Sequence, residues 1–332
     1  MAGIIVINLG TPNSPSTADV RSYLREFLSD PYVIDIPAIP RWILVNCIIA
    51  PFRAPKSAHA YASIWTEQGS PLLVHSVALC KNIQEKLPAH RVVLAMRYGK
   101  PDIAKALDML KDETDIIVLP LYPQYAGATT QTVLDSVEHL RKQHCPNSTV
   151  HSVPPFYNHP TYIENLAHTV TSLEFDHLLM SYHGLPIRQL PCTEKNQYRC
   201  HEHAQSHCPA VHADFPNCYR AHCYETSRLL ATQLNLPADR WSVSFQSRLG
   251  KIPWIEPYTS NHIETLRNNG VEHLAVICPS FVTDCLETLE EIDIGIRADF
   301  LHKGGKSFTL IPCLNAEPAW AVQLLEEQLQ SL

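Results

Sequence analysis

The fold is decided most clearly by residues 176–186, whose sequence is DHLLMSYHGLP. Its apolar run is nearly continuous, as in a strand that is covered on both faces of a parallel sheet. A Gly-Leu-Pro turn then ends the run. His183 is therefore predicted at the carboxyl end of a strand, and open α/β sheets bind their ligands beyond that end.

Seven further stretches predict strands, with helical segments between them. The other predicted strands are 3–9, 91–97, 115–121, 149–153, 241–246, 272–279 and 306–311. The predicted helices are 18–28, 75–86, 103–110, 130–143, 162–173, 224–234, 261–269, 286–301 and 318–330. This alternation is typical of a doubly wound α/β fold, here formed twice. We expect two four-stranded parallel sheets, joined near residues 154–175.

Length and charge limit the function classes. The chain has 332 residues and a mass of 37.4 kDa, which at about 150 residues per domain favours two domains. A formal net charge of −7 and a pI of about 6.2 argue against a nucleic-acid binder. The sequence contains neither GxGxxG nor GxxxxGK[ST], which makes a glycine-rich nucleotide-binding protein a poor fit.

Two apolar segments bear on localisation. The first ten residues, MAGIIVINLG, lack a basic region and a cleavage site, so we expect a strand there and not a signal peptide. Residues 42–52 are too short to span a bilayer, and the chain is expected to be cytoplasmic. The wider segment 40–55 is apolar with a basic end. It fits a hydrophobic lip for an apolar ligand or membrane surface, or an ordinary core helix.

Four polar side chains follow predicted strands of the second half. At a strand end, His183 fits a metal ligand or a base, or a structural histidine bonded to a neighbouring loop. Asp284, Glu287 and Glu291 are spaced i, i+3, i+7 and share one helix face. Because like charges repel, a hydrated divalent cation or protons in transit would compensate them. Alternatively, Asp284 caps the helix and Glu291 is solvated.

Two residues close a strand of the first half. Arg97 and Tyr98 end the predicted strand 91–97 and are placed to meet an anionic substrate. A structural carboxylate is an equally good partner for Arg97.

Seven motifs together resemble one enzyme family, ferrochelatase. They are INLGTPNSP, YASIWTEQGSPLL, MRYGKP, LPLYPQYAGATT, SYHGLP, SFQSRLGKIPWIEPYT and CPSFVTDCLETLEEID. The resemblance runs from about residue 3 to about residue 318, outside one insertion. Members of the family insert Fe²⁺ into protoporphyrin IX in the last step of haem synthesis.

The resemblance implies an architecture and a set of partners. It implies two similar Rossmann-like domains, 1–160 and 175–315, each a four-stranded parallel sheet flanked by helices, with a porphyrin-sized cleft between them. The C-terminal helix 316–332 is expected to pack back on the first domain, which carries the lip 40–55. The expected substrates are protoporphyrin IX and Fe²⁺, and peripheral contact with the inner membrane is expected. The chain itself is expected to be a monomer or a homodimer.

The resemblance also assigns roles to individual residues. His183 and Glu287 correspond to the pair that handles the iron and the pyrrole protons, and Asp284 and Glu291 to the path that leads to it. The implied porphyrin contacts are Leu9, Arg97, Tyr98 and Tyr125. Iron is then the substrate, not a resident cofactor.

These residue types suit the reaction. Metal insertion into a porphyrin requires the loss of two pyrrole N–H protons, of which a neutral imidazole accepts one while carboxylates relay them away. Oxygen and imidazole ligands hold Fe²⁺ without trapping it as thiolates would. Bending of the macrocycle would expose the nitrogen lone pairs.

The segment 187–223 has no helical or alternating apolar period and is predicted to be a loop-like insertion. It contains five of the 11 cysteines, which are Cys192, Cys200, Cys208, Cys218 and Cys223. Four thiolates are what a [2Fe–2S] cluster needs, and some ferrochelatases carry such a cluster. The favoured ligands are Cys200, Cys208, Cys218 and Cys223, with Cys192 in reserve. Zinc, or a loop with no fixed metal, is the alternative.

Two other functions remain open at this stage. One is a related chelatase that acts on coproporphyrin or sirohydrochlorin. The other is a cluster-based sensor in which chelation has been lost.

Overall fold

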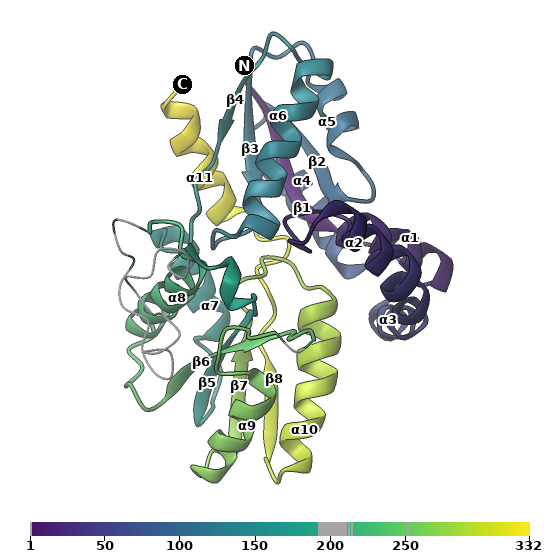
Figure 1. Cartoon of the computed structure of the whole chain (residues 1–332). Helices are drawn as coiled ribbons and strands as arrows, with labels where there is room; N and C mark the ends of the chain where they lie inside the picture. The colour runs from purple at the N-terminus through teal and green to yellow at the C-terminus, as the bar shows by residue number, and fades with distance from the viewer. Residues whose placement is uncertain (1, 192–210, 212, 214, 251) are drawn as a thin grey trace. The chain divides into compact units, whose positions relative to one another are not determined.

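The computed structural model describes residues 2–191, 211, 213, 215–250 and 252–332 (Figure 1). The chain forms two compact units. Unit 1 contains residues 1–122, 127–154 and 315–332, and unit 2 contains residues 123–126 and 155–314. The C-terminal segment therefore belongs to the first unit, whereas 155–160 belongs to the second.

Unit 1 is built on a parallel sheet in the order β2-β1-β3-β4. The strands are β1 Ala2–Gly10, β2 Arg91–Tyr98, β3 Asp115–Pro120 and β4 Thr149–Ser152. Side chains of β1 such as Ile5 and Ile7 are fully buried, because helices cover both faces of the sheet. Burial on both faces explains why residues 3–9 of the sequence form a nearly continuous apolar run.

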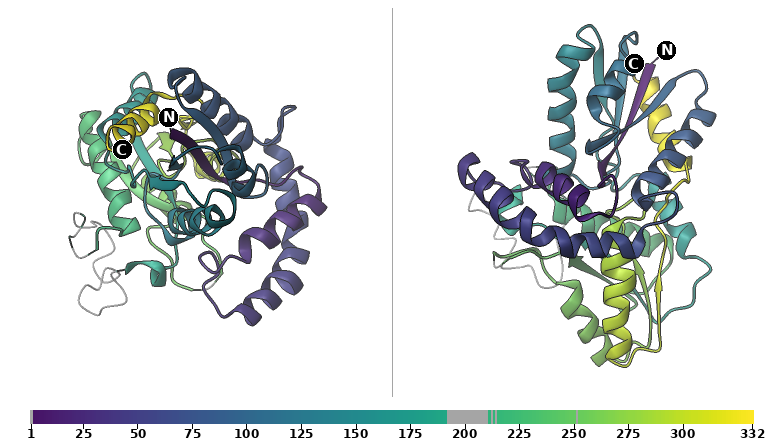
Figure 2. Two further views of the ribbon diagram at one scale, coloured as in Figure 1. Left: turned by 90° about the horizontal axis from the view of Figure 1, so that it is seen from above. Right: turned by 90° about the vertical axis from the view of Figure 1, so that its right-hand side faces the viewer.

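The helices of unit 1 form two layers and an arm. They are α1 Thr17–Leu28, α2 Ala38–Ile43, η1 Leu44–Ile49, α3 Ala50–Ile64, α4 Pro71–Lys86, α5 Ile103–Met109, η2 Gly127–Gln131, α6 Thr132–His144 and α11 Ala319–Gln330. Helices α5 and α6 pack side by side, and α4 contacts α11 (Figures 1 and 2). The arm consists of α2, η1 and α3, with α3 against α1.

Unit 2 repeats this plan with the order β6-β5-β7-β8. The strands are β5 His177–His183, β6 Trp241–Gln246, β7 His273–Ile277 and β8 Ser307–Leu310. The helices are α7 Pro160–Val170, η3 Ile187–Gln189, α8 Tyr219–Gln233, α9 Thr259–Asn268, η5 Glu287–Ile296 and α10 Arg297–His302. All pairings in both sheets are parallel, which confirms the predicted fold class.

Two predicted elements differ from the structure. The helix expected at 286–301 is a π-helix over Glu287–Ile296 and an α-helix only from Arg297. The loop-like insertion was expected to reach residue 223, but α8 begins at Tyr219, so the prediction is wrong over 219–223. The first turns of α8 are buried on nearly all sides, which removes the polar face that marks most helices in a sequence.

The arm of unit 1 exposes apolar side chains. Ile39, Trp42, Ile48 and Phe52 are 75%, 61%, 52% and 78% exposed. Cys47 is also exposed. Segment 40–55 therefore exposes apolar side chains on one side, while Val45, Ala50 and Ala54 on its other side are fully buried. None of the described helices is long and apolar enough to cross a membrane.

Candidate active site

The carboxyl ends of three neighbouring strands of unit 2 define the candidate site. Strand β5 ends at His183 and β6 at Gln246, and these two residues are paired in the sheet. Strand β7 leads into Ser280 and then into η5. Because the strands are parallel, their polar ends lie at one edge of the sheet.

The ring of His183 has a defined tautomer. Its Nδ1 lies 2.7 Å from the carbonyl oxygen of Gly184. A carbonyl oxygen only accepts hydrogen bonds, so Nδ1 carries a proton, and in the neutral ring the lone pair is on Nε2. The side chain is half-buried, and the ring of Phe281 lies edge-on with centroids 6.4 Å apart. His183 thus presents a basic nitrogen at the strand end.

Gly184 is required by the close approach of β6. Its N–H donates to the carbonyl oxygen of Gln246 at 2.8 Å. A Cβ atom at this position would lie 2.7 Å from the same oxygen and 3.3 Å from the Trp254 ring. Any larger residue would push the end of β5 away from β6, and the acceptor of the His183 proton would move with it.

Glu291 faces the same strand ends. Its carboxylate accepts the backbone N–H of Ser247 at 2.7 Å and the Ser247 hydroxyl at 2.5 Å. Burial raises the pKa of Glu291, while the hydroxyl of Ser247 and the charge of His183 lower it and the charge of Glu287 raises it again. His183, Glu287 and Glu291 therefore interact electrostatically, and we name them the strand-end cluster.

Ser247 has an unusual backbone conformation. Its φ is 67°, in the left-handed region that few residues other than glycine adopt. This conformation aims both its N–H and its hydroxyl at Glu291. Strained residues of this kind occur often at functional sites.

Glu287 and Asp284 have different surroundings. Glu287 is half-buried at the start of η5, and its carbonyl oxygen accepts from Gln246 Nε2 at 2.8 Å. Asp284 is 6% exposed and accepts from the Thr288 hydroxyl at 3.1 Å and the Cys313 N–H at 3.4 Å. Asp284 thus links the start of η5 to the segment around Cys313, but the N-terminus of η5 has no side-chain cap, so Asp284 does not cap it. The π-helix itself is rare and occurs often at functional sites.

Gln246 was not among the site residues predicted from the sequence. Its backbone oxygen binds Gly184, its Nε2 binds Glu287, and its Oε1 accepts the Ser181 hydroxyl at 2.7 Å. It therefore joins the His183 turn to the π-helix. The only signal was its place in the motif SFQSR at a strand end.

A cavity of about 220 Å³ adjoins Glu291. Its lining is mostly polar and consists of Phe245, Gln246, Ser247, Arg248, Tyr258, Thr259, Ser260, Asn261, Glu291 and Ile296. Arg248 lies over the Tyr258 ring at 4.7 Å. In the described part of the chain, no three His, Cys, Asp or Glu side chains form a preformed metal site.

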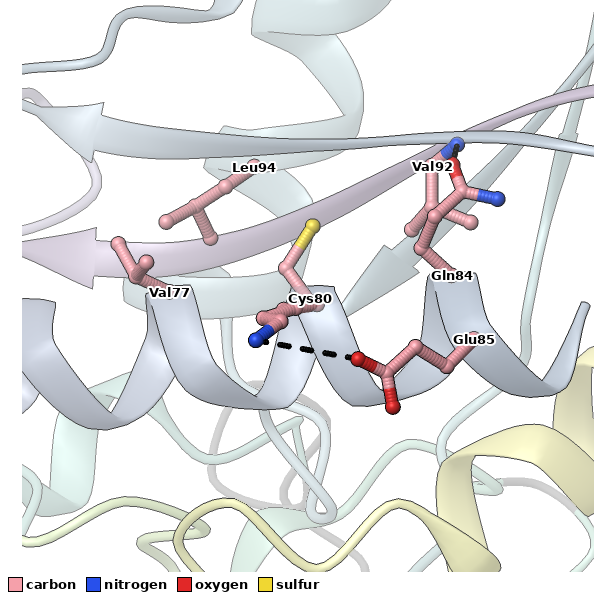
Figure 3. A pocket seen from close by; sticks show the side chains of 7 residues that line it. Val77, Cys80, Gln84, Glu85, Val92 and Leu94 are labelled. Atoms are coloured by element: carbon pink, nitrogen blue, oxygen red, sulfur yellow. Dashed lines mark hydrogen bonds and ion pairs between the residues drawn. The ribbon is translucent and has the colours of Figure 1, made fainter. Parts of the chain in front are cut away.

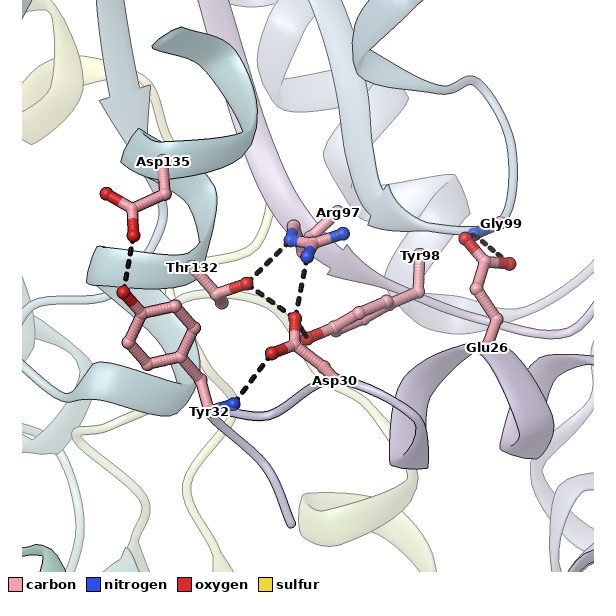
Figure 4. Close-up of polar contacts among 8 residues, drawn as sticks. All are labelled: Glu26, Asp30, Tyr32, Arg97, Tyr98, Gly99, Thr132 and Asp135. Atoms are coloured by element: carbon pink, nitrogen blue, oxygen red, sulfur yellow. Dashed lines mark hydrogen bonds and ion pairs between the residues drawn. The ribbon is translucent and has the colours of Figure 1, made fainter. Parts of the chain in front are cut away.

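Unit 1 gives Arg97 and Tyr98 a common partner, Asp30 (Figure 4). Oδ2 of Asp30 accepts from Arg97 Nη2 at 2.6 Å, the Tyr98 hydroxyl at 2.8 Å and the Thr132 hydroxyl at 2.6 Å. Arg97 Nε donates to Thr132 at 2.9 Å. Tyr98 is only 1% exposed, so in this structure it supports Arg97 and does not line a surface. Arg97 is therefore paired with a structural carboxylate, which was one of its two predicted partners.

The other two predicted porphyrin contacts are half-buried. Leu9 packs against the core of unit 1. Tyr125 belongs to unit 2, where its N–H donates to Nδ1 of His222 at 3.2 Å.

Two of the five clustered cysteines can be placed. Cys218 precedes the first residue of α8 and is 4% exposed, and Cys223 lies within α8 and is fully buried. Neither forms a disulfide. Cys192, Cys200 and Cys208 lie outside the described residues.

A larger cavity, of about 430 Å³, lies elsewhere (Figure 3). It is formed by α4 and the edge strand β2, and its lining is Val77, Cys80, Lys81, Gln84, Glu85, Val92 and Leu94. Burial raises the pKa of Cys80 to about 11, so its thiol stays protonated and a poor nucleophile. This cavity contains no predicted site residue.

Comparisons with known proteins agree with the motifs. The model of the ferrochelatase family matches residues 1–331. A ferrochelatase of Legionella pneumophila (strain Philadelphia 1) is 45% identical over 96% of each chain. A ferrochelatase of Coxiella burnetii (strain Dugway 5J108-111) is 44% identical over 99% of this chain and 94% of the relative.

Two solved structures share the fold. CbiX, described as the terminal enzyme for biosynthesis of siroheme in denitrifying bacteria, has a TM-score of 0.50 at 13% identity, over 99% of this chain and 98% of that one. SirB from Bacillus subtilis with Fe³⁺ has a TM-score of 0.52 at 10% identity, over 100% and 95%. At these identities they bear on the fold alone.

Proposed function

Because the chain belongs to the ferrochelatase family, it is an enzyme that inserts ferrous iron into a porphyrin to form protohaem, and we propose that the strand-end cluster carries out this step. The observation that supports this most is geometric: His183 ends β5, and Glu291 is hydrogen-bonded to Ser247 just after the neighbouring strand β6, so both lie at one edge of the sheet. Partial burial strengthens the interaction between the charges of the cluster, so each proton state influences the others.

His183 acts as the first proton acceptor. Its Nδ1–H bond to Gly184 leaves the Nε2 lone pair to take a pyrrole proton or to contact the incoming Fe²⁺. The nearby carboxylates stabilise the imidazolium cation that forms. Fe²⁺ is a substrate here and leaves with the porphyrin.

The carboxylates remove protons and balance the metal charge. Burial raises the pKa of Glu291, so this carboxylate accepts a proton more readily and can then release it. The two donors on Ser247 keep its charged form accessible. Glu287 supplies a second carboxylate, and Asp284 fixes the start of the helix that carries both.

Glutamine substitutions test the carboxylates. We expect Glu287→Gln and Glu291→Gln to lower the rate of iron insertion by roughly 100-fold or more, in line with a lost general acid or base. Asp299→Asn is the matched control, because Asp299 is an exposed carboxylate on the continuation of the same helix. The assay is anaerobic insertion followed by porphyrin absorbance, with porphyrin affinity from fluorescence quenching. Glutamine variants as fast as the control would contradict the proposal.

The same assay compares substrates. Protoporphyrin IX, coproporphyrin and sirohydrochlorin are each supplied with Fe²⁺. We expect the highest rate on protoporphyrin IX. A preference for coproporphyrin or sirohydrochlorin would reject protohaem as the product.

Three half-buried residues are proposed porphyrin contacts, namely Leu9, Arg97 and Tyr125. Since Asp30 already neutralises Arg97 in part, we expect Arg97→Leu to raise the porphyrin KM several-fold. An unchanged KM would remove Arg97 from the set.

The cysteine-rich segment is proposed to hold a [2Fe–2S] cluster through Cys200, Cys208, Cys218 and Cys223. Support comes from the number of cysteines in 192–223 and from the burial of the two described ones, Cys218 and Cys223. Anaerobically purified protein should show absorption between about 330 and 550 nm and roughly two irons per chain. A colourless protein with about one zinc would replace the cluster by a zinc site. Cys218→Ser should lose the bands, and Cys145→Ser, a buried control in unit 1, should keep them.

The exposed arm of unit 1 is proposed to contact the cytoplasmic face of the inner membrane. Phe52 and Trp42 are 78% and 61% exposed, and Arg53 and Lys56 are exposed beside them. Phe52→Ser should reduce co-sedimentation with vesicles that contain anionic lipid. Val77→Ser is the control, because Val77 is 52% exposed on α4, outside the arm. Equal losses in both variants would reject the arm as the contact.

The oligomeric state, monomer or homodimer, stays a prediction. Sedimentation velocity on the purified chain distinguishes the two.

A further inference from the structure

We propose that Tyr219 is a positioning residue for His183. The proposal rests on the role of His183 proposed above, and it concerns a contact that spans 36 positions in sequence. Tyr219 is the first residue of α8 and is 7% exposed. Its hydroxyl donates to the backbone oxygen of His183 at 2.8 Å.

The peptide group between His183 and Gly184 is held at both ends. Its oxygen accepts from Tyr219, and its N–H donates to the backbone oxygen of Gln246 at 2.8 Å. Two opposed hydrogen bonds across one planar group fix the orientation of that plane. Without Tyr219 only the β6 side of this restraint remains.

Ser280 adds a third restraint. The N–H of His183 donates to the Ser280 hydroxyl at 3.2 Å. The same side chain is hydrogen-bonded to the Tyr219 phenol, where it opposes the larger rise in pKa that burial causes. Tyr219 and Ser280 together therefore hold both backbone polar groups of His183.

This restraint reaches the imidazole ring through the next carbonyl. The oxygen of Gly184 accepts Nδ1–H of His183 at 2.7 Å and so selects the tautomer with a lone pair on Nε2. The position of that oxygen depends on the preceding peptide plane. Removing the Tyr219 hydroxyl loosens the plane, and the ring then samples the tautomer whose Nε2 carries a proton and accepts nothing.

The test compares Tyr219→Phe with Tyr182→Phe. Both variants remove one buried hydroxyl from the contact between β5 and α8, since Tyr182 is hydrogen-bonded to Ser227 of α8 at 2.8 Å. Of these two hydroxyl groups, only that of Tyr219 is hydrogen-bonded to the backbone of His183. We expect Tyr219→Phe to lower kcat by about 10-fold or more with an unchanged porphyrin KM, as for other partners that orient a reacting group. Tyr182→Phe should keep kcat within about twofold, even if its melting temperature falls equally.

A spectroscopic readout separates positioning from stability. In ¹⁵N-histidine NMR spectra, the Nδ1–H signal of His183 is the one absent from His183→Ala. We expect Tyr219→Phe to weaken that signal and Tyr182→Phe to leave it unchanged. The proposal is overturned if the two phenylalanine variants agree in both kcat and tautomer signal. A fully active His183→Ala would instead overturn the proposed function, while the tautomer signal would still report on Tyr219.

Discussion

Asp30→Asn tests whether the buried carboxylate that Arg97, Tyr98 and Thr132 share stabilises unit 1. Asp30 is 6% exposed and its Oδ2 accepts from three donors on β2 and α6, while Oδ1 accepts the Tyr32 N–H at 2.8 Å. An amide has no charge to offer Arg97, and its NH₂ group would face donors in place of an acceptor.

The expected magnitude follows from burial. Removing one partner of a buried ion pair costs about 3–5 kcal/mol, because the remaining charge is left without compensation. The Arg97 side chain is 21% exposed, so the lower end of that range applies best. For units of this size about 1 kcal/mol corresponds to roughly 2–4 °C. We therefore expect the melting temperature to fall by about 6–12 °C.

Asp135→Asn is the matched control for Asp30→Asn. Asp135 accepts the Tyr32 hydroxyl and Gln131 Nε2 at the exposed end of the same group of residues. An exposed carboxylate contributes less than about 1 kcal/mol, so this variant should melt within about 3 °C of the parent. Thermal unfolding monitored by circular dichroism measures both. Equal melting temperatures for the two variants would show that the buried Asp30 carboxylate contributes no more to stability than the exposed Asp135.

Three further outcomes are expected. Burial and, to a smaller extent, the charge of His262 together lower the pKa of His177 to about 4. The stability that this shift contributes is therefore full above pH 6.5 and declines as pH falls toward 4, by about 3 kcal/mol at most. In His177→Gln, the free energy of unfolding in urea should therefore depend less on pH over that range. An unchanged pH dependence would reject the assignment to His177. Gly184→Ala should cost about 1–3 kcal/mol, measured by urea unfolding, and should slow insertion, because its Cβ meets the Gln246 oxygen at 2.7 Å. Ser247→Ala removes a donor from Glu291 and should move the acid limb of the pH–rate profile to higher pH; a shift to lower pH would contradict the reasoning.

The sequence predicted the sheets well because the strands are covered on both faces. Continuous apolar runs such as residues 3–9 and 115–121 correspond to β1 and β3 within a residue or two. The position of His183 at the end of β5 followed from the same logic, since a polar residue directly after such a run lies at the carboxyl end of the strand. Local patterns were sufficient for these features.

The rest depended on contacts between residues far apart in the chain. Asp30 meets Arg97 across 67 positions, and Tyr219 meets His183 across 36. No local periodicity encodes either pair. The π-helix was also missed, because the spacing of acidic residues in 284–291 predicts an α-helical face, whereas the wider i→i+5 turn begins at Glu287.

The most direct test of the central claim is a single-turnover measurement on His183→Ala. Excess enzyme, loaded with protoporphyrin IX and mixed anaerobically with Fe²⁺, reports the insertion step itself. We expect normal porphyrin binding, a melting temperature within about 3 °C of the parent, and insertion slowed by roughly 100-fold or more. Insertion at the parent rate in a folded, porphyrin-loaded variant would contradict the proposed role of His183.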